Sequence, residues 1–270
     1  MSTQNHKRQF EDQGYLIFEN LLTPDDLAKS MAEIERLHDV AKTANEVDKG
    51  DFEVEPFAKQ SEEGGKPILR KMERTYKHSK WFDQLASNPR LVAVLTELLG
   101  PKLLLYRSTL MLKPAFHGSV HGFHQDTSYW PMRPPHLVTV SIALTDATPE
   151  NGCFQVIPGS HTWGMQDIER WGEIARDQNS ALTDRKDIDT KQAIHVPLKA
   201  GSVLFFHSSV VHGSGPNRSP NSRNTALYAY FTPDVKYMPQ GGAPREQSYR
   251  VVAGIEDKKE ITFVAEEVRG

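Results

Sequence analysis

The segment His124-Gln125-Asp126 offers an imidazole and a carboxylate two residues apart. In an extended chain, side chains at positions i and i+2 point to the same face, so both groups could bind one metal ion. A third ligand is available at His212, just after an apolar run, although His207 at the end of that run competes for the role. Two imidazoles and one carboxylate form the ligand set of non-haem Fe(II) oxygenases, which leaves positions open for a co-substrate and O2.

A basic residue follows the distal histidine in the sequence, at a spacing that suits a role in anion binding. Arg223 comes eleven residues after His212, at the start of the strand-like run 224–232. An arginine in that place could bind a carboxylate through two parallel hydrogen bonds, each worth about 1.5–3 kcal/mol. A dicarboxylate that chelates iron at one end and meets an arginine at the other is 2-oxoglutarate. This spacing favours His212 over His207 as the third ligand.

Other catalytic signatures are missing from the sequence. It contains no GxGxxG, GxxxxGK[ST], HExxH or GxSxG motif, so Rossmann, P-loop and α/β-hydrolase chemistry lack their usual support. Cys153 is the single cysteine and lies in an apolar run, which predicts a buried structural thiol rather than a nucleophile. The net charge of −3 provides no basic field for nucleic acid or for an anionic membrane.

The 270 residues contain no internal repeat and no linker, which predicts a single domain. We expect residues 1–100 to form mostly helical support with a lid, 101–235 a β core and 236–270 a C-terminal extension. Thr23-Pro24-Asp25-Asp26 predicts the start of a helix that runs to about residue 44. Residues 48–66 are acidic and aperiodic, which predicts a surface loop that could act as the lid.

From residue 102 onward the pattern changes to short strands separated by turns. Apolar side chains alternate with small or polar ones in 138–144, with period 2. Further strand-like runs lie at 102–113, 154–157, 193–197, 203–207 and 226–232. Many short strands behind a helical N-terminal portion predict a mainly β protein, in which an antiparallel sandwich or barrel has helices on one face.

At these residues the sequence resembles the phytanoyl-CoA dioxygenase family of Fe(II)- and 2-oxoglutarate-dependent oxygenases. The resemblance is carried by the spacing of the HQD motif, His212 and Arg223, and by the neighbouring segments HQDTSYWP, NGC and IPGSH. The N-terminal FEDQGY and the helix after Thr23 also match, so the resemblance covers nearly the whole chain.

This resemblance implies a double-stranded β-helix core, the jelly-roll fold of the cupins, with N-terminal helices. It implies that His124, Asp126 and His212 bind iron. Halogenases of the family replace the carboxylate with a small residue, and this chain retains Asp126. The resemblance therefore implies hydroxylation, or a related oxidation such as desaturation.

The co-substrate residues come from the same resemblance. It implies that Arg223 forms a salt bridge with 2-oxoglutarate and that Ser214, two residues after the distal histidine, helps to hold the same carboxylate. Lys71 and Thr109 align with further co-substrate contacts of the family.

The substrate is not specified by these motifs. HQDTSYWPMRPP differs from the longer signature of the ectoine hydroxylases, and no segment indicates a coenzyme A site. Tyr129, Trp130 and Met132 are the candidates for the substrate wall, with 48–66 as a lid. We expect a small organic substrate and neither a nucleic acid nor a membrane as partner.

Two other functions fit the same residues. Two histidines and one aspartate could bind Zn2+ and a water molecule, which would make a hydrolase. The chain could also be a jelly-roll binding protein with a vestigial metal site.

A single cysteine and the lack of an apolar N-terminal segment predict a soluble protein of a reducing compartment, the cytoplasm.

Overall fold

The structure of the protein is a computed structural model that describes residues 3–44, 49–55, 68–164, 189–239 and 244–266. Its main sheet contains, in spatial order, β1 (Tyr15–Phe18), β10 (Val203–His207), β7 (Val138–Ala143), β12 (Arg223–Phe231), β4 (Leu103–Lys113), β14 (Glu246–Ala253) and β15 (Glu260–Val264). Strand β14 pairs with the first residues of β4, and β3 (Leu69–Glu73) pairs with later residues of β4 on the same side. Strand β3 also pairs with β2 (Phe52–Val54). A second sheet orders β5 (His121–His124), β11 (His212–Ser214), β8 (Phe154–Val156) and β9 (Ile194–Val196).

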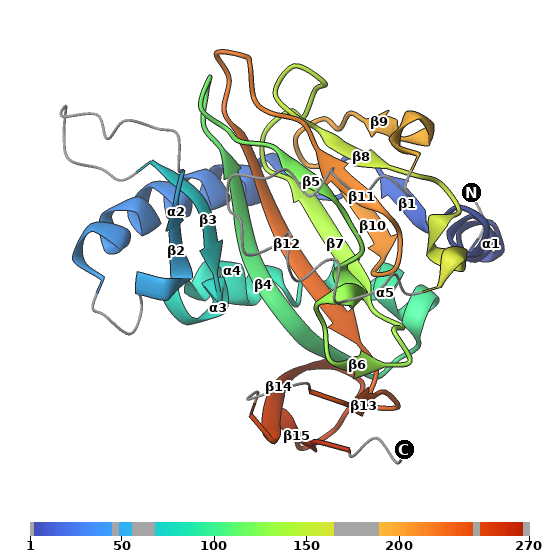
Figure 1. Cartoon of the computed structure of the whole chain (residues 1–270). Coiled ribbons are helices and arrows are strands. Elements are labelled where there is room, and N and C mark those ends of the chain that lie inside the picture. Colours follow the sequence, from blue (N-terminus) through green and yellow to red (C-terminus); the bar gives the residue numbers. More distant parts are fainter. Residues whose placement is uncertain (1–2, 45–48, 56–67, 165–188, 240–243, 267–270) are drawn as a thin grey trace.

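The two sheets form the predicted jelly roll (Figure 1). All their strand pairs are antiparallel. Val156 and Val196 of the smaller sheet pack in one buried cluster with Leu204 and Phe206 of the main sheet. Burial of these side chains holds the sheets together and leaves a cavity between their other residues.

Within the described residues, five helices accompany the main sheet: α1 (Thr3–Gln13), α2 (Pro24–Thr43), α3 (Thr75–His78), α4 (Lys80–Leu85) and α5 (Pro89–Leu99). Helix α2 begins where the sequence predicts. Thr23 Oγ1 accepts a hydrogen bond from the Asp26 amide, and Asp26 Oδ2 accepts one from the Thr23 amide, which makes a capping box. The apolar faces of the helices bury the outer face of the sheet in the largest core cluster.

Strand β12 connects this core to the cavity because its side chains alternate between two faces. Tyr228 and Tyr230 face the helices, where their hydroxyls donate to the backbone oxygens of Phe82 at 2.9 Å and Ala86 at 2.7 Å. Arg223, which lies an odd number of residues from both tyrosines, lines the cavity on the opposite face. A buried arginine is therefore placed by a strand that is anchored over its whole length.

The prediction of a surface loop at 48–66 is wrong for the first part of this segment. Lys49–Asp51 forms a short 3-10 helix, and Phe52–Val54 is strand β2. The buried Phe52 ring joins the main core, and the β2 backbone finds a partner in β3, so this short acidic segment becomes part of the sheet. Residues 56–66 of the proposed lid lie outside the described residues.

The C-terminal residues extend the fold rather than leave it. Strands β14 and β15 add to the main sheet beside β4, and β13 (Lys236–Tyr237) pairs with β6 (Met132–Arg133). Among the described residues, no helix is both long and apolar enough to cross a bilayer.

Candidate active site

His124, Asp126 and His212 come together at one end of the smaller sheet. Strands β5 and β11 pair so that the two histidines lie directly opposite each other, and Asp126 opens the 3-10 turn that follows β5. Asp126 Oδ1 lies 3.5 Å from His124 Nε2 and 3.9 Å from His212 Nε2. The three candidate ligand atoms lie within 4.8 Å of one another, and all three residues are buried.

Hydrogen bonds orient these three groups toward a common point. The Nδ1 atoms of His124 and His212 lie 2.9 and 3.0 Å from the carbonyl oxygens of Gly122 and Val210. A carbonyl can only accept, so Nδ1 carries the proton and Nε2 keeps its lone pair for a metal. Thr139 on β7 donates to Asp126 Oδ2 at 3.0 Å, which leaves Oδ1 facing the histidines.

The electrostatics favour the deprotonated forms that a metal requires. Burial alone would raise the pKa of Asp126, but the neighbouring His212 and His124 lower it to about 2. Burial, together with nearby His124, lowers the pKa of His212 to about 4. At neutral pH the group is thus a carboxylate with a neutral imidazole beside it. Nitrogen and oxygen ligands without a thiolate suit Fe(II).

His207, the competing candidate, lies elsewhere. It ends β10, and its ring lies 5.5 Å from that of His161 and 6.0 Å from that of His136. It is not part of the candidate metal group. The structure brings His212, and not His207, to His124 and Asp126.

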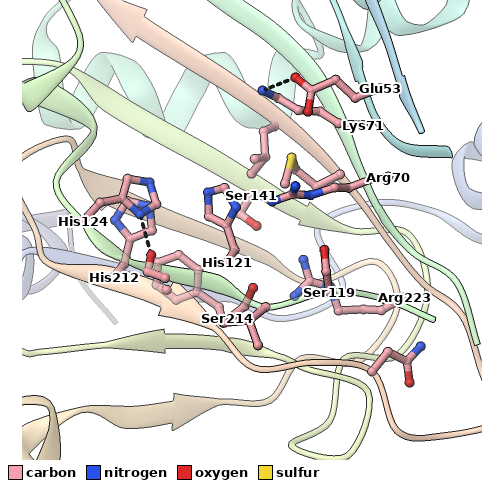
Figure 2. Close-up of a pocket in the computed structure, with 18 of the residues that line it drawn as sticks. Glu53, Arg70, Lys71, Ser119, His121, His124, Ser141, His212, Ser214 and Arg223 are labelled. Carbon is pink, nitrogen blue, oxygen red and sulfur yellow. Dashed lines mark hydrogen bonds and ion pairs between the residues drawn. The ribbon is translucent and has the colours of Figure 1, made fainter. Parts of the chain in front are cut away.

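A cavity of about 1170 Å³ opens beside the metal group, and Arg223 lines its far part (Figure 2). Arg223 is 8% exposed and donates from Nη1 to the Gly152 carbonyl. Its Nε is buried and has no hydrogen-bond partner in the described part of the chain. Burial lowers its pKa to about 10, so the guanidinium remains charged at neutral pH. Ser214, on β11 beside it, also lines the cavity.

A second basic residue lies next to Arg223 in the sheet. Lys113, opposite Arg223 in the sheet, is buried with its ammonium on the backbone oxygens of Ser119 and Gly215. Burial and the charge of Arg223 hold the pKa of Lys113 well below its usual range. Within the described residues, no carboxylate is paired with Arg223 or Lys113. The residues present therefore fit an anion that the protein does not itself supply.

Arg70 is a cavity residue that sequence reasoning missed. In the β2–β3 pairing, Glu53 faces Lys71 and Val54 faces Leu69, so Arg70 is the extra residue of a β-bulge. The bulge lets Leu69 remain in the core while Arg70 and Lys71 both line the cavity. Arg70 has no ion pair with any described residue. The irregular alternation of LRKME hides this placement from any period-2 pattern.

The model of the family described as "Phytanoyl-CoA dioxygenase (PhyH)" matches residues 10–225. The chain belongs to this family. It is 27% identical over 259 residues to the peroxisomal phytanoyl-CoA dioxygenase of Rattus norvegicus, with 94% of this chain and 75% of the relative covered. It is 30% identical over 240 residues to the ectoine dioxygenase of Stutzerimonas stutzeri, with 82% of this chain and 74% of the relative covered.

Solved structures share the fold of this family member. The non-haem monooxygenase ThoJ superposes with a TM-score of 0.73 at 24% identity, over 97% of this chain and 87% of the other. EctD from S. alaskensis with 2-oxoglutarate and 5-hydroxyectoine gives 0.67 at 24% identity, over 86% and 76%. With its family, fold and His–Asp–His group, the chain is a non-haem Fe(II)- and 2-oxoglutarate-dependent dioxygenase. The hydrolase and binding-protein alternatives are not favoured.

Lys71 and Thr109, the two further co-substrate candidates, are both engaged by Glu73. Lys71 Nζ lies 2.6 Å from Glu73 Oε1 and 3.2 Å from Glu53 Oε1. Thr109 donates to Glu73 Oε2 at 2.6 Å, and Arg107 pairs with the same carboxylate. Thr109 is not among the residues that line the cavity. Their roles toward 2-oxoglutarate in this dioxygenase stay predictions.

The three substrate-wall candidates differ in their positions. Tyr129 is 41% exposed and lines the cavity, and Trp130 lines it with one side while its ring packs 4.7 Å from that of Tyr106. Met132 is a wrong prediction, because it is fully buried in the cluster with Phe231 and does not line the cavity. Pairing of β6 with β13 turns this side chain toward the core.

Proposed function

We propose that His124, Asp126 and His212 hold the Fe(II) of this dioxygenase and that Arg223, with Ser214, binds one carboxylate of 2-oxoglutarate. The observation that carries this proposal is one cavity shared by the buried metal group and a charged arginine that no carboxylate of the described residues neutralises. When bound, iron and 2-oxoglutarate supply the activation of O2, with release of succinate and CO2. The outcome is hydroxylation, or a related oxidation, of an unactivated C–H bond.

The chain's own residues prepare this chemistry by orientation and by exclusion of water. The Gly122 and Val210 carbonyls fix the imidazoles, as described above, and Thr139 fixes the carboxylate. Phe154 stacks on the His212 ring at 5.1 Å between centroids, and Phe206 lies 4.7 Å away on the same ring. These aromatic contacts keep solvent from one side of the metal group.

Opposite the metal, the basic residues neutralise the co-substrate. Arg223 contributes a permanent charge, and Arg70, unpaired by any described residue, supplies a second one across the cavity. A guanidinium matches a carboxylate with two parallel N–H donors, so it fixes direction as well as charge. Together they support a doubly charged co-substrate that extends from the metal toward β12.

The substrate that we propose is a small organic molecule in the part of the cavity near Tyr129 and Trp130. The relatives named above are an ectoine dioxygenase and a phytanoyl-CoA dioxygenase, which differ widely in substrate. A cavity of about 1170 Å³ has room for a small molecule beside 2-oxoglutarate. A cytoplasmic location stays a prediction.

The test is conversion of 2-oxoglutarate to succinate with added Fe(II) and ascorbate. Asp126→Ala and His212→Gln should abolish it, whereas His207→Gln, outside the metal group, should retain it. Tight Fe(II) binding and undiminished turnover by Asp126→Ala would overturn the proposal. Zinc retained after anaerobic purification, without any effect of 2-oxoglutarate, would instead favour a hydrolase.

A further inference from the structure

His121 lies in the co-substrate part of the cavity, but no step described so far uses it. It is the first residue of β5 and faces Ser214 across the β5–β11 pair. Its ring lies 4.9 Å from that of His124, edge to face. Figure 2 shows it between the two metal histidines on one side and Arg70 and Arg223 on the other.

The ring of His121 lacks a hydrogen-bond partner among the described residues. Its Nδ1 is buried without one, and no bond to Nε2 is found in the described part of the chain. His124 and His212 in the same sheet each satisfy Nδ1 with a carbonyl. Since Nδ1 is buried and His121 lines the cavity, Nε2 is the ring nitrogen that remains available to a group bound there.

The surroundings of His121 specify the charge of that group. Arg70 and Arg223 line the same cavity on one side of it (Figure 2), and the nearby buried acid, Glu55, accepts from Ser119 at 3.3 Å. A ligand between His121 and these two guanidinium groups meets positive charge, so it is an anion. An anion accepts hydrogen bonds, which requires that the imidazole present an N–H to it.

We propose that His121 is a further co-substrate-binding residue, whose Nε2–H donates a hydrogen bond to a carboxylate oxygen of 2-oxoglutarate. The inference rests on the proposed function, since it assumes that 2-oxoglutarate lies between the metal group and Arg223. Of its two nitrogens, Nε2 is the one assigned to the ligand because Nδ1 is sealed from solvent. This hydrogen bond from His121 would add to the co-substrate contacts of Ser214 and Arg223, and a neutral imidazole brings no further permanent charge to the site.

The test compares His121→Phe with His121→Gln, which keeps an N–H donor at a similar reach. Fe(II)-loaded full-length protein is titrated anaerobically with 2-oxoglutarate, and the visible charge-transfer band of the chelate gives Kd. We expect His121→Phe to raise Kd at least about tenfold, which corresponds to about 1.4 kcal/mol, and His121→Gln to restore most of the affinity. His117→Phe, an exposed histidine at the same cavity, is the matched control.

Fe(II) affinity and the midpoint of thermal unfolding are measured for each variant without 2-oxoglutarate. If His121→Phe binds 2-oxoglutarate as tightly as the wild type at saturating Fe(II), the inference is wrong, and a change in metal affinity alone would assign His121 to support of His124. Equal losses in the phenylalanine and glutamine variants would also overturn it. If the wild type itself forms no band, the proposed function fails instead.

Discussion

Replacement of Arg223 by glutamine tests the co-substrate site most directly. The side chain is 8% exposed, and it is held at the Gly152 carbonyl by Nη1 while Nε has no partner within the described residues. Glutamine removes the charge and the paired N–H donors but keeps a polar side chain on β12. The metal ligands come from β5, β11 and the turn after β5, so the variant leaves their positions unchanged.

The expected loss follows from the burial of this charge. Removing one partner of a buried, hydrogen-bonded charge pair costs about 2–5 kcal/mol. At about 1.4 kcal/mol for each factor of ten, Kd for 2-oxoglutarate should rise roughly 30-fold to 4,000-fold. Arg70 and the metal continue to attract the anion, which favours the lower half of that range.

Anaerobic titration of the Fe(II) protein with 2-oxoglutarate measures this loss, and a competing chelator measures Fe(II) affinity in parallel. Arg218→Gln is the control, because Arg218 is an exposed arginine that lines the same cavity. The reasoning is refuted if Arg223→Gln binds 2-oxoglutarate as the wild type does, or if it loses iron and co-substrate affinity by equal factors. The first result would indicate that the carboxylate of 2-oxoglutarate binds at Arg70 instead of Arg223.

Three further substitutions test the supports of the site. Thr139→Val removes the hydrogen bond to Asp126 and should lower Fe(II) affinity about 10- to 100-fold, as measured by chelator competition. Glu73→Gln breaks its pairs with an arginine and a lysine; these pairs are partly exposed, so we expect about 1–3 kcal/mol less stability in urea unfolding at pH 7. Burial raises the pKa of Glu73, but Arg107 and Lys71 lower it to about 2. The difference in stability between the wild type and Glu73→Gln should therefore shrink as the pH falls from 4.5 toward 2. Gly152→Ala places a Cβ at a residue with φ +77°, where it would overlap the Gly215 carbonyl oxygen. We expect this variant to lose about 2 kcal/mol or more of folding stability, as measured by thermal unfolding.

Features encoded by near neighbours in the chain could be predicted from the sequence. The capping box at Thr23 and Asp26 lies within four residues, so the start of α2 is evident from its residues alone. The two ligands of the HQD motif are likewise close in the chain. The alternation of 138–144 predicts the central strand β7, because strands of regular period show which residues share a face.

Features that depend on pairing partners could not be predicted. Strand β2 exists because β3 offers it an edge, and nothing in 48–54 shows that partner. Arg70 reaches the cavity only through the bulge between these strands. Met132 follows Tyr129 and Trp130 in the chain, but the pairing of its strand turns its side chain into the core and away from the cavity.

The three metal-binding candidates do not all depend on the same sheet. His124 and His212 belong to the smaller sheet, whereas Asp126 is hydrogen-bonded to Thr139 of the main sheet. An ion held by all three would cross-link the two halves of the sandwich. By mass action, a ligand at a hundred times its Kd adds about 2.7 kcal/mol to folding stability. Iron limitation would then reduce the folded fraction of this enzyme as well as its turnover, which couples its abundance to the supply of its metal.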